Sequence, residues 1–202
     1  MLESISLAIA LLALVISAVT AWLTLFRRGT VRMTQPTVVF FGPDGGRPDR
    51  RSMAKVFLRT LLYATADRGQ IIQSMFVVLR RDGEPQTFGI WVYGDRDHLL
   101  RGSGLYVGKE GVSSNHHFLL SDGVQYEFQA GTHHLEVFVA TAHQTKPHRL
   151  WSLPIELTEE QATAIRKERA GVYFDWDPSR RRFDSHIDPH PAEPRALVRP
   201  LS

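Results

Sequence analysis

Histidine is the residue type in this 202-residue chain whose number and spacing suggest chemistry, because nine are present and four form two adjacent pairs. Imidazole binds transition metals and titrates near neutral pH. The candidates for a metal site are His116, His117, His133 and His134. Adjacent strand residues point to opposite faces, so only one histidine of each pair could join a shared site, with Glu127 or Glu136 as third ligand. The absence of a clear third ligand favours the alternative, in which the histidines are hydrogen-bonded structural residues.

Two other segments have the composition of a ligand-binding loop without its spacing. RGSGLYVGKEG, residues 101–111, has Ser103 and Glu110 where a phosphate-binding P-loop requires a glycine and a hydroxyl residue. Residues 175–180 begin like a calcium loop but have neither its glycine nor its closing glutamate. No nucleophile elbow, zinc-protease motif or kinase motif is present. The sequence therefore predicts no enzyme activity and no cofactor, and a plain turn near residue 178.

Composition narrows the expected partners. The chain has 24 basic and 21 acidic residues, a formal charge of +3, and this small surplus gives little support for nucleic-acid binding. It has no cysteine, which excludes disulfides, thiolate metal sites and a cysteine nucleophile. We therefore expect a lipid bilayer and a protein as partners, and no nucleic acid.

The segment from Ile5 to Phe26 has no charged residue and no proline, and it is long enough to cross a hydrocarbon core of about 30 Å as a helix. No lysine or arginine precedes it, whereas Arg27, Arg28 and Arg32 follow it. Because basic flanks favour the cytoplasmic side, we expect a single-pass protein of the cell membrane with its N-terminus outside and residues 27–202 in the cytoplasm. The three arginines are expected to contact lipid head groups. The alternative, a cleaved signal peptide, requires a basic start and a shorter apolar run.

Small residues recur along one stripe of this predicted membrane helix at spacings of three and four. They are Ser6, Ala10, Ala13, Ser17, Thr20 and Thr24. Small side chains allow two helix backbones to approach closely in lipid. The stripe predicts self-association or packing against another membrane protein. The alternative is chance, because alanine, serine and threonine are frequent throughout the segment.

Beyond residue 35, short runs of β-branched and aromatic residues alternate with Gly, Pro and Asp, a pattern typical of an all-β domain. The predicted strands are Thr37–Gly42, Lys55–Thr65, Ile71–Arg81, Gln86–Tyr93, Gly104–Val107, Ser114–Leu120, Gln125–Phe128, His133–Thr141 and Leu150–Leu157. Asp82-Gly83 and Asp122-Gly123 are expected to form hairpin turns. The expected product is a sandwich of two antiparallel sheets.

The segment YEFQAGTHHLEVFVATA, residues 126–142, resembles the paired late strands of immunoglobulin-like and fibronectin type III domains. In both, a glycine-containing turn leads into alternating apolar residues. The resemblance implies an immunoglobulin-like two-sheet antiparallel sandwich. It covers 17 residues, and the chain departs from it by having His133 and His134 where such domains usually have a tyrosine.

A short helix is predicted at TEEQATAIRKERAG, residues 158–171, with Thr158 and Gln161 as a capping box and Gly171 as the stop. Its narrow apolar face places it at an edge of the sandwich. A hairpin is expected to follow, formed by VYFDW and RRRF. The predicted organisation is an anchor at 1–33, a sandwich at 34–157, the helix and hairpin at 158–188, and a disordered proline-rich tail at 189–202.

These expectations together predict a membrane-anchored, non-enzymatic interaction module. Its partner would be a protein, bound through apolar residues on an outer sheet face, such as Phe57, Leu61, Tyr63 or Phe138. The alternative function is a membrane-tethered sensor that binds a small ligand or a metal through the sandwich histidines.

Overall fold

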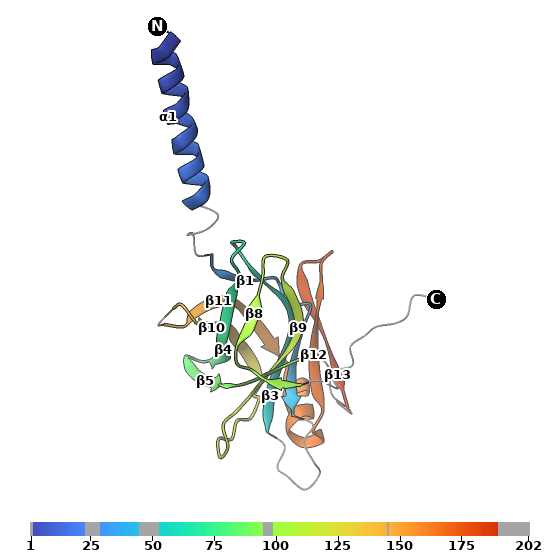
Figure 1. Ribbon diagram of the computed structural model, residues 1–202. Coiled ribbons are helices and arrows are strands. Elements are labelled where there is room, and N and C mark those ends of the chain that lie inside the picture. The colour runs from blue at the N-terminus through green and yellow to red at the C-terminus, as the bar shows by residue number, and fades with distance from the viewer. Residues whose placement is uncertain (1, 23–28, 45–52, 95–98, 145, 190–202) are drawn as a thin grey trace, which may run out of the picture.

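The computed structural model describes residues 2–22, 29–44, 53–94, 99–144 and 146–189. Two antiparallel sheets form most of these residues, with one long helix before them and one short helix late in the chain (Figure 1). The predicted all-β architecture is confirmed at this level.

The N-terminal helix α1 runs from Leu2 to Ala21 and stands apart from the sheets (Figure 1). It contains a span of 19 residues, Glu3–Ala21, with a mean hydropathy of 2.4, which is long and apolar enough to cross a membrane. Its large apolar side chains from Ile5 to Val19 are 51% to 65% exposed, so the sandwich does not bury them. Of the predicted packing stripe, Ser6 to Thr20 lie on this helix. Thr24, Arg27 and Arg28 lie outside the described residues.

The first sheet, sheet A, has the strand order β13-β12-β2-β3-β9-β6-β7, with β1 also paired to β3. Its strands are β1 (Val31–Met33), β2 (Val38–Pro43), β3 (Ala54–Ala64), β6 (Ile90–Tyr93), β7 (Leu100–Arg101), β9 (Val112–Leu119), β12 (Gly171–Asp177) and β13 (Arg182–Asp188). The sheet begins at Val31, before the predicted boundary at residue 34. The predicted C-terminal hairpin is present as β12 and β13, and it extends the sheet because β12 pairs with β2.

The second sheet, sheet B, has the order β11-β10-β4-β5, and β8 pairs with β4. Its strands are β4 (Gln70–Arg81), β5 (Glu84–Phe88), β8 (Leu105–Val107), β10 (Gly131–Thr141) and β11 (His148–Leu157). The Asp82-Gly83 turn joins β4 to β5 with positive φ at both residues, as the sequence predicts. The predicted strand over 86–93 is divided at Gly89, so that β5 belongs to sheet B and β6 to sheet A.

One predicted strand, Gln125–Phe128, is wrong. The Asp122-Gly123 turn forms, but residues 124–129 pair with no strand, because β3 and β6 already occupy both edges of β9. Phe128 instead enters the space between the sheets, where its ring stacks on Phe41 at 5.1 Å. It joins a shared core of inward-facing side chains such as Leu58 and Val137.

The predicted helix is present as α2 (Glu159–Thr163), continued by one π-helical turn, η2 (Ala164–Glu168). The capping box is confirmed: Gln161 N donates to Thr158 Oγ1 at 3.2 Å, and Thr158 N donates to Gln161 Oε1 at 3.0 Å. The helical segment ends at Arg169, whose φ is 56°, rather than at Gly171. This segment connects β11 of sheet B to β12 of sheet A at one end of the sandwich.

Strand register defines two opposite ends of the sandwich. The β1 end consists of residues 29–37, 65–69, 108–111, 142–144, 146–147 and 178–181, which begin or connect strands on the side of β1. The α2 end consists of residues 44, 53, 82–83, 120–130 and 158–170. β1 and the β12–β13 turn lie on the same side in Figure 1, with α2 on the opposite side.

Candidate functional site

His116 and His117 lie on β9 of sheet A and point to opposite faces, as strand alternation predicts. His116 is fully buried in the core, and its Nδ1 accepts a hydrogen bond from Trp91 Nε1 at 3.1 Å. Burial lowers the pKa of His116 to about 3, with His117 adding a smaller effect. His117 packs on the Phe57 ring on the outer face, and burial followed by the charge of Lys55 lowers its pKa to about 4. Both rings are therefore neutral at neutral pH.

His133 and His134 lie near the start of β10 of sheet B and also point to opposite faces. His133 is buried, and its Nε2 lies 2.7 Å from the backbone oxygen of Gln129. Burial is the largest cause of its lowered pKa. His134 is exposed, and its strand partners are Arg80 and Pro154.

The structure does not gather the histidine candidates into a metal site. Within the described ranges, no three His, Asp or Glu side chains lie close enough together to hold a metal ion. Glu136, one of the two expected third ligands, instead accepts a hydrogen bond from Arg80 Nε at 2.9 Å and another from Arg149 Nη1 at 2.6 Å. These two hydrogen bonds are the main reason that the pKa of Glu136 lies below its ordinary value.

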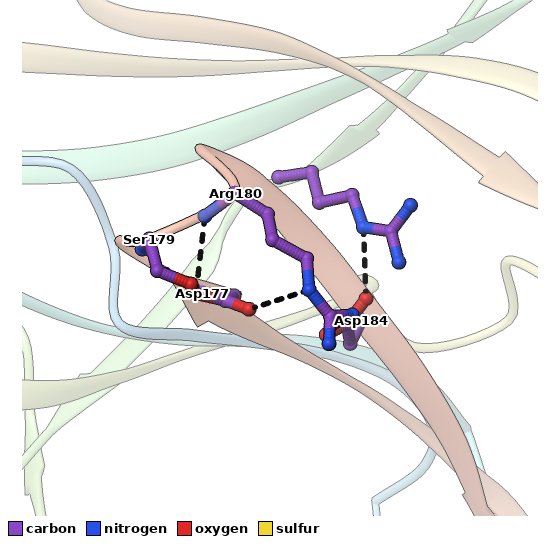
Figure 2. A network of polar contacts seen from close by, with 5 residues as sticks. Asp177, Ser179, Arg180 and Asp184 are labelled. Carbon is purple, nitrogen blue, oxygen red and sulfur yellow. Dashed lines mark hydrogen bonds and ion pairs between the residues drawn. The ribbon is translucent and has the colours of Figure 1, made fainter.

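The two segments that resemble ligand-binding loops in composition, residues 101–111 and 175–180, form polar contacts with other residues of the chain. Lys109 pairs with Asp67 at 2.8 Å. In the β12–β13 turn, Asp177 Oδ1 accepts hydrogen bonds from Ser179 N at 2.8 Å, Ser179 Oγ at 2.6 Å and Arg180 N at 3.2 Å (Figure 2). Arg180 forms one ion pair with Asp177 and another with Asp184, each at 3.3 Å. This carboxylate therefore holds a plain turn, as predicted.

An open cleft of about 430 Å³ lies at the α2 end. Its lining comes from the end of β2, the start of β3, the connection before β10, and η2, in the set Gly42, Pro43, Met53, Ala54, Val124, Gln125, Tyr126, Glu127, Phe128, Ile165, Arg166 and Arg169. The Tyr126 ring packs against Phe88 at 5.6 Å and Phe128 at 5.2 Å. Burial raises the pKa of Tyr126 to about 12, so its phenol remains a neutral hydrogen-bond donor.

The cleft places charged groups beside this apolar lining. Arg166 donates to Glu159 at 3.0 Å. Arg169 is exposed and has no carboxylate partner among the described residues. Glu127 supplies a negative charge on the connection before β10. The arrangement can bind a segment with apolar and acidic groups, since its guanidinium groups are donors for carboxylates.

Sequence reasoning did not identify Tyr126, Arg166 or Arg169 as site residues. Both arginines lie in the segment predicted as a helix, residues 158–171. Tyr126 was assigned to a strand. The sequence feature that points to these residues is the positive charge shortly before Gly171. That feature alone does not indicate a cleft, because the cleft is formed by residues that are far apart in the sequence.

The predicted apolar outer surface is divided between the sheets. Phe57 lies on the outer face of sheet A, but its side chain is only 3% exposed, and Leu61 and Tyr63 are half-buried. Phe138 lies on the outer face of sheet B, half-buried and stacked on Phe76 at 5.1 Å. These four residues therefore do not form one exposed patch.

The two ends of the sandwich differ in formal charge. In the described residues of the β1 end, six basic side chains stand against two acidic ones, a formal charge of +4. They are Arg32, Arg68, Lys109, Lys146, Arg180 and Arg181, against Asp67 and Glu110. In the described residues of the α2 end, three basic side chains stand against seven acidic ones, a formal charge of −4. The formal charges of segments 45–52 and 95–98, which are +2 and −1, do not reverse either sign.

Comparison of the chain with protein-family models, curated proteins and solved structures finds no match.

Proposed function

We propose that the chain is a single-pass, membrane-anchored interaction module whose β-sandwich binds another protein and catalyses no reaction. The observation that carries this proposal is the exposed apolar surface of α1 next to a sandwich with an open cleft at its far end. Exposed leucine, isoleucine and valine on 20 consecutive helical residues are costly in water and stable in lipid. The bilayer is accordingly one partner, and a second chain of this protein or another membrane helix packs on the Ser6-to-Thr20 stripe.

The proposed orientation places the N-terminus outside and the sandwich in the cytoplasm of the cell. Its support is the flanking charge: Arg27, Arg28 and Arg32 follow the apolar segment, and no basic residue precedes it. Arg32 is exposed on β1, at the end where the sandwich begins. In this orientation the three arginines contact head groups of the cytoplasmic leaflet.

We infer further that the sandwich is immunoglobulin-like. The orders β2-β3-β9-β6 and β11-β10-β4-β5 correspond to the A-B-E-D and G-F-C-C′ orders of that fold. The bond between His133 and Gln129, four residues upstream, corresponds to the bond that a tyrosine makes at the same corner in immunoglobulin domains. The chain departs from antibody domains because it has no cysteine and no tryptophan on β4.

The cleft at the α2 end is the proposed protein-binding site. Tryptophan, tyrosine and arginine are the residue types that contribute most to protein–protein binding. Tyr126, Ile165 and Arg169 meet there, although they come from separate segments. The partner segment is expected to combine an apolar side chain with a carboxylate.

Site-specific crosslinking of the full chain in its native membrane tests this site. A photoreactive phenylalanine analogue at Val124, which lines the cleft, should give one adduct of discrete mass. The same analogue at Thr87, exposed on sheet B, should not. The combined substitution Arg166→Ala and Arg169→Ala should remove the adduct, whereas Lys167→Ala should retain it. Absence of an adduct at Val124, or an adduct insensitive to both arginines, would contradict the proposal.

A further inference from the structure

The β1 end carries exposed cations whose charges the sandwich itself does not neutralise. Lys109 and Arg180 are paired with Asp67 and Asp177. The other four are Arg32, Arg68, Lys146 and Arg181, all of which are exposed and have no carboxylate partner among the described residues. They come from β1, the β3–β4 turn, the β10–β11 hairpin and the β12–β13 turn, so four separate segments supply positive charge to one end.

The chain itself keeps this end close to α1. Seven peptide steps separate Trp22 from Gly29, which limits the distance between them to about 25 Å even in a fully extended chain. Gly29 lies directly before β1, at the positively charged end. The acidic end begins at the opposite end of strands such as β4, whose 12 residues span about 40 Å.

We propose that the β1 end docks on anionic lipid head groups of the bilayer that α1 spans. This inference rests on the proposed membrane anchoring and extends the lipid contact from the arginines of the linker to the β3–β4, β10–β11 and β12–β13 connections. The occupant is the bilayer because the tether brings an anionic surface to this end and the charge is complementary. Docking directs the acidic end and its cleft away from the membrane, where a protein partner has access.

Single-cysteine labelling can test this docking directly, because the natural chain contains no cysteine. Ala142→Cys places a fluorophore in the exposed β10–β11 hairpin of the β1 end, and Ser121→Cys places one in the exposed connection at the α2 end. Each labelled full-length chain is inserted into lipid nanodiscs that contain a lipid with a nitroxide quencher on its head group. One set of discs contains phosphatidylcholine, and the other also contains phosphatidylglycerol.

The expected result is quenching at residue 142 that is at least threefold stronger in phosphatidylglycerol discs and is lost in high salt. Quenching at residue 121 should be weak in both. Arg68→Gln, Lys146→Gln and Arg181→Gln combined should return residue 142 to the level seen in neutral lipid. The matched control Arg166→Gln, Lys167→Gln and Arg169→Gln removes the same formal charge from the α2 end and should change nothing at residue 142. Unchanged thermal unfolding midpoints would exclude misfolding as the cause.

The possible failures are distinguishable. A chain that does not enter the discs would contradict the membrane anchoring and, with it, the docking. A chain that enters the discs but shows equal quenching at residue 142 in both lipids would overturn the docking alone. Quenching that is independent of lipid charge, together with loss of an acidic protein partner in the Arg68, Lys146 and Arg181 variant, would assign this surface to a protein instead.

Discussion

The β1 end and the α2 end of the sandwich differ in charge and in shape. The described residues of the β1 end have a formal charge of +4 and consist of β1 and short connections, of which the turn at residues 178–181 is held by hydrogen bonds to Asp177. Those of the α2 end have a formal charge of −4 and surround a cleft. About 40 Å separates them along β4, whereas salt screens charges within about 10 Å at 0.1 M. The two proposed contacts, of the β1 end with lipid and of the α2 end with a protein, are therefore electrostatically independent.

The largest expected effect concerns the side of the membrane on which both ends of the sandwich lie. A reporter enzyme that is active only after export should be silent when fused after Ser202, and a reporter that is active only in the cytoplasm should be active there. Each signal should differ at least tenfold from that of the same reporter on the opposite side of the membrane. Replacing Arg27, Arg28 and Arg32 with Gln and adding three arginines after Met1 should reverse both results, because basic flanks determine orientation. An active exported reporter in the natural chain would place the sandwich outside.

The next effect concerns the core that holds the two ends apart. The unfolded chain protonates His116 below about pH 6.5, whereas burial lowers the folded pKa to about 3. The free energy of unfolding of the protein therefore falls as the pH decreases between these values. His116 accounts for a loss of about 2 kcal/mol at pH 5. His116→Gln keeps an acceptor for Trp91 and should remove about that part of the loss, measured by urea unfolding of residues 29–189 at pH 7 and pH 5.

His143→Gln serves as the control for this prediction, because His143 is exposed at the β1 end. It should leave the acid sensitivity intact. An equal loss of stability on acidification in the natural fragment and in the His116→Gln variant would show that the buried ring does not cause it.

A smaller effect is expected from removing the helix cap at the α2 end. Thr158→Ala removes the cap at which α2 begins and should lower the free energy of unfolding by about 1 kcal/mol. It should also weaken crosslinking at Val124, because α2 and η2 position Arg166 and Arg169. Thr132→Ala, exposed on β10, is the matched control and should change neither measurement. If the two variants were equally stable, the cap would not contribute measurably to this end.

Local pattern was sufficient to predict most elements of this fold, and nonlocal pairing accounts for the errors. Thr158 and Gln161 identify a helix start, and Asp82-Gly83 identifies a hairpin, because each depends on neighbouring residues alone. Residues 125–128 alternate like a strand, yet β9 has no free edge for them. Gly89 gives no local indication that the chain changes sheets there.

The same distinction applies to the candidate site. The opposite orientation of His116 and His117 follows from strand periodicity and was predicted. The cleft joins Pro43, Tyr126 and Arg169, which are far apart in the sequence, and no short pattern contains them together. The charge difference between the two ends was equally hidden, because each end collects one or two charges from each of several turns.

The smallest expected effect on stability is that of replacing Arg169, and it tests whether this side chain serves binding in the cleft. Its φ of 56° lies in the left-handed region, which glycine adopts without steric cost and in which helices commonly end at glycine. Arg169→Gly should therefore leave the free energy of unfolding unchanged or raise it by about 0.5 kcal/mol, while removing one of the two guanidinium groups of the cleft. Crosslinking at Val124 should fall severalfold, and Arg169→Lys should restore part of it because a cation is retained. Arg181→Gly makes the same kind of replacement at a φ of 53° on the β1 end and should leave crosslinking at Val124 unchanged. If Arg169→Gly kept full crosslinking, its side chain would have no role in binding and the cleft would depend on its apolar lining.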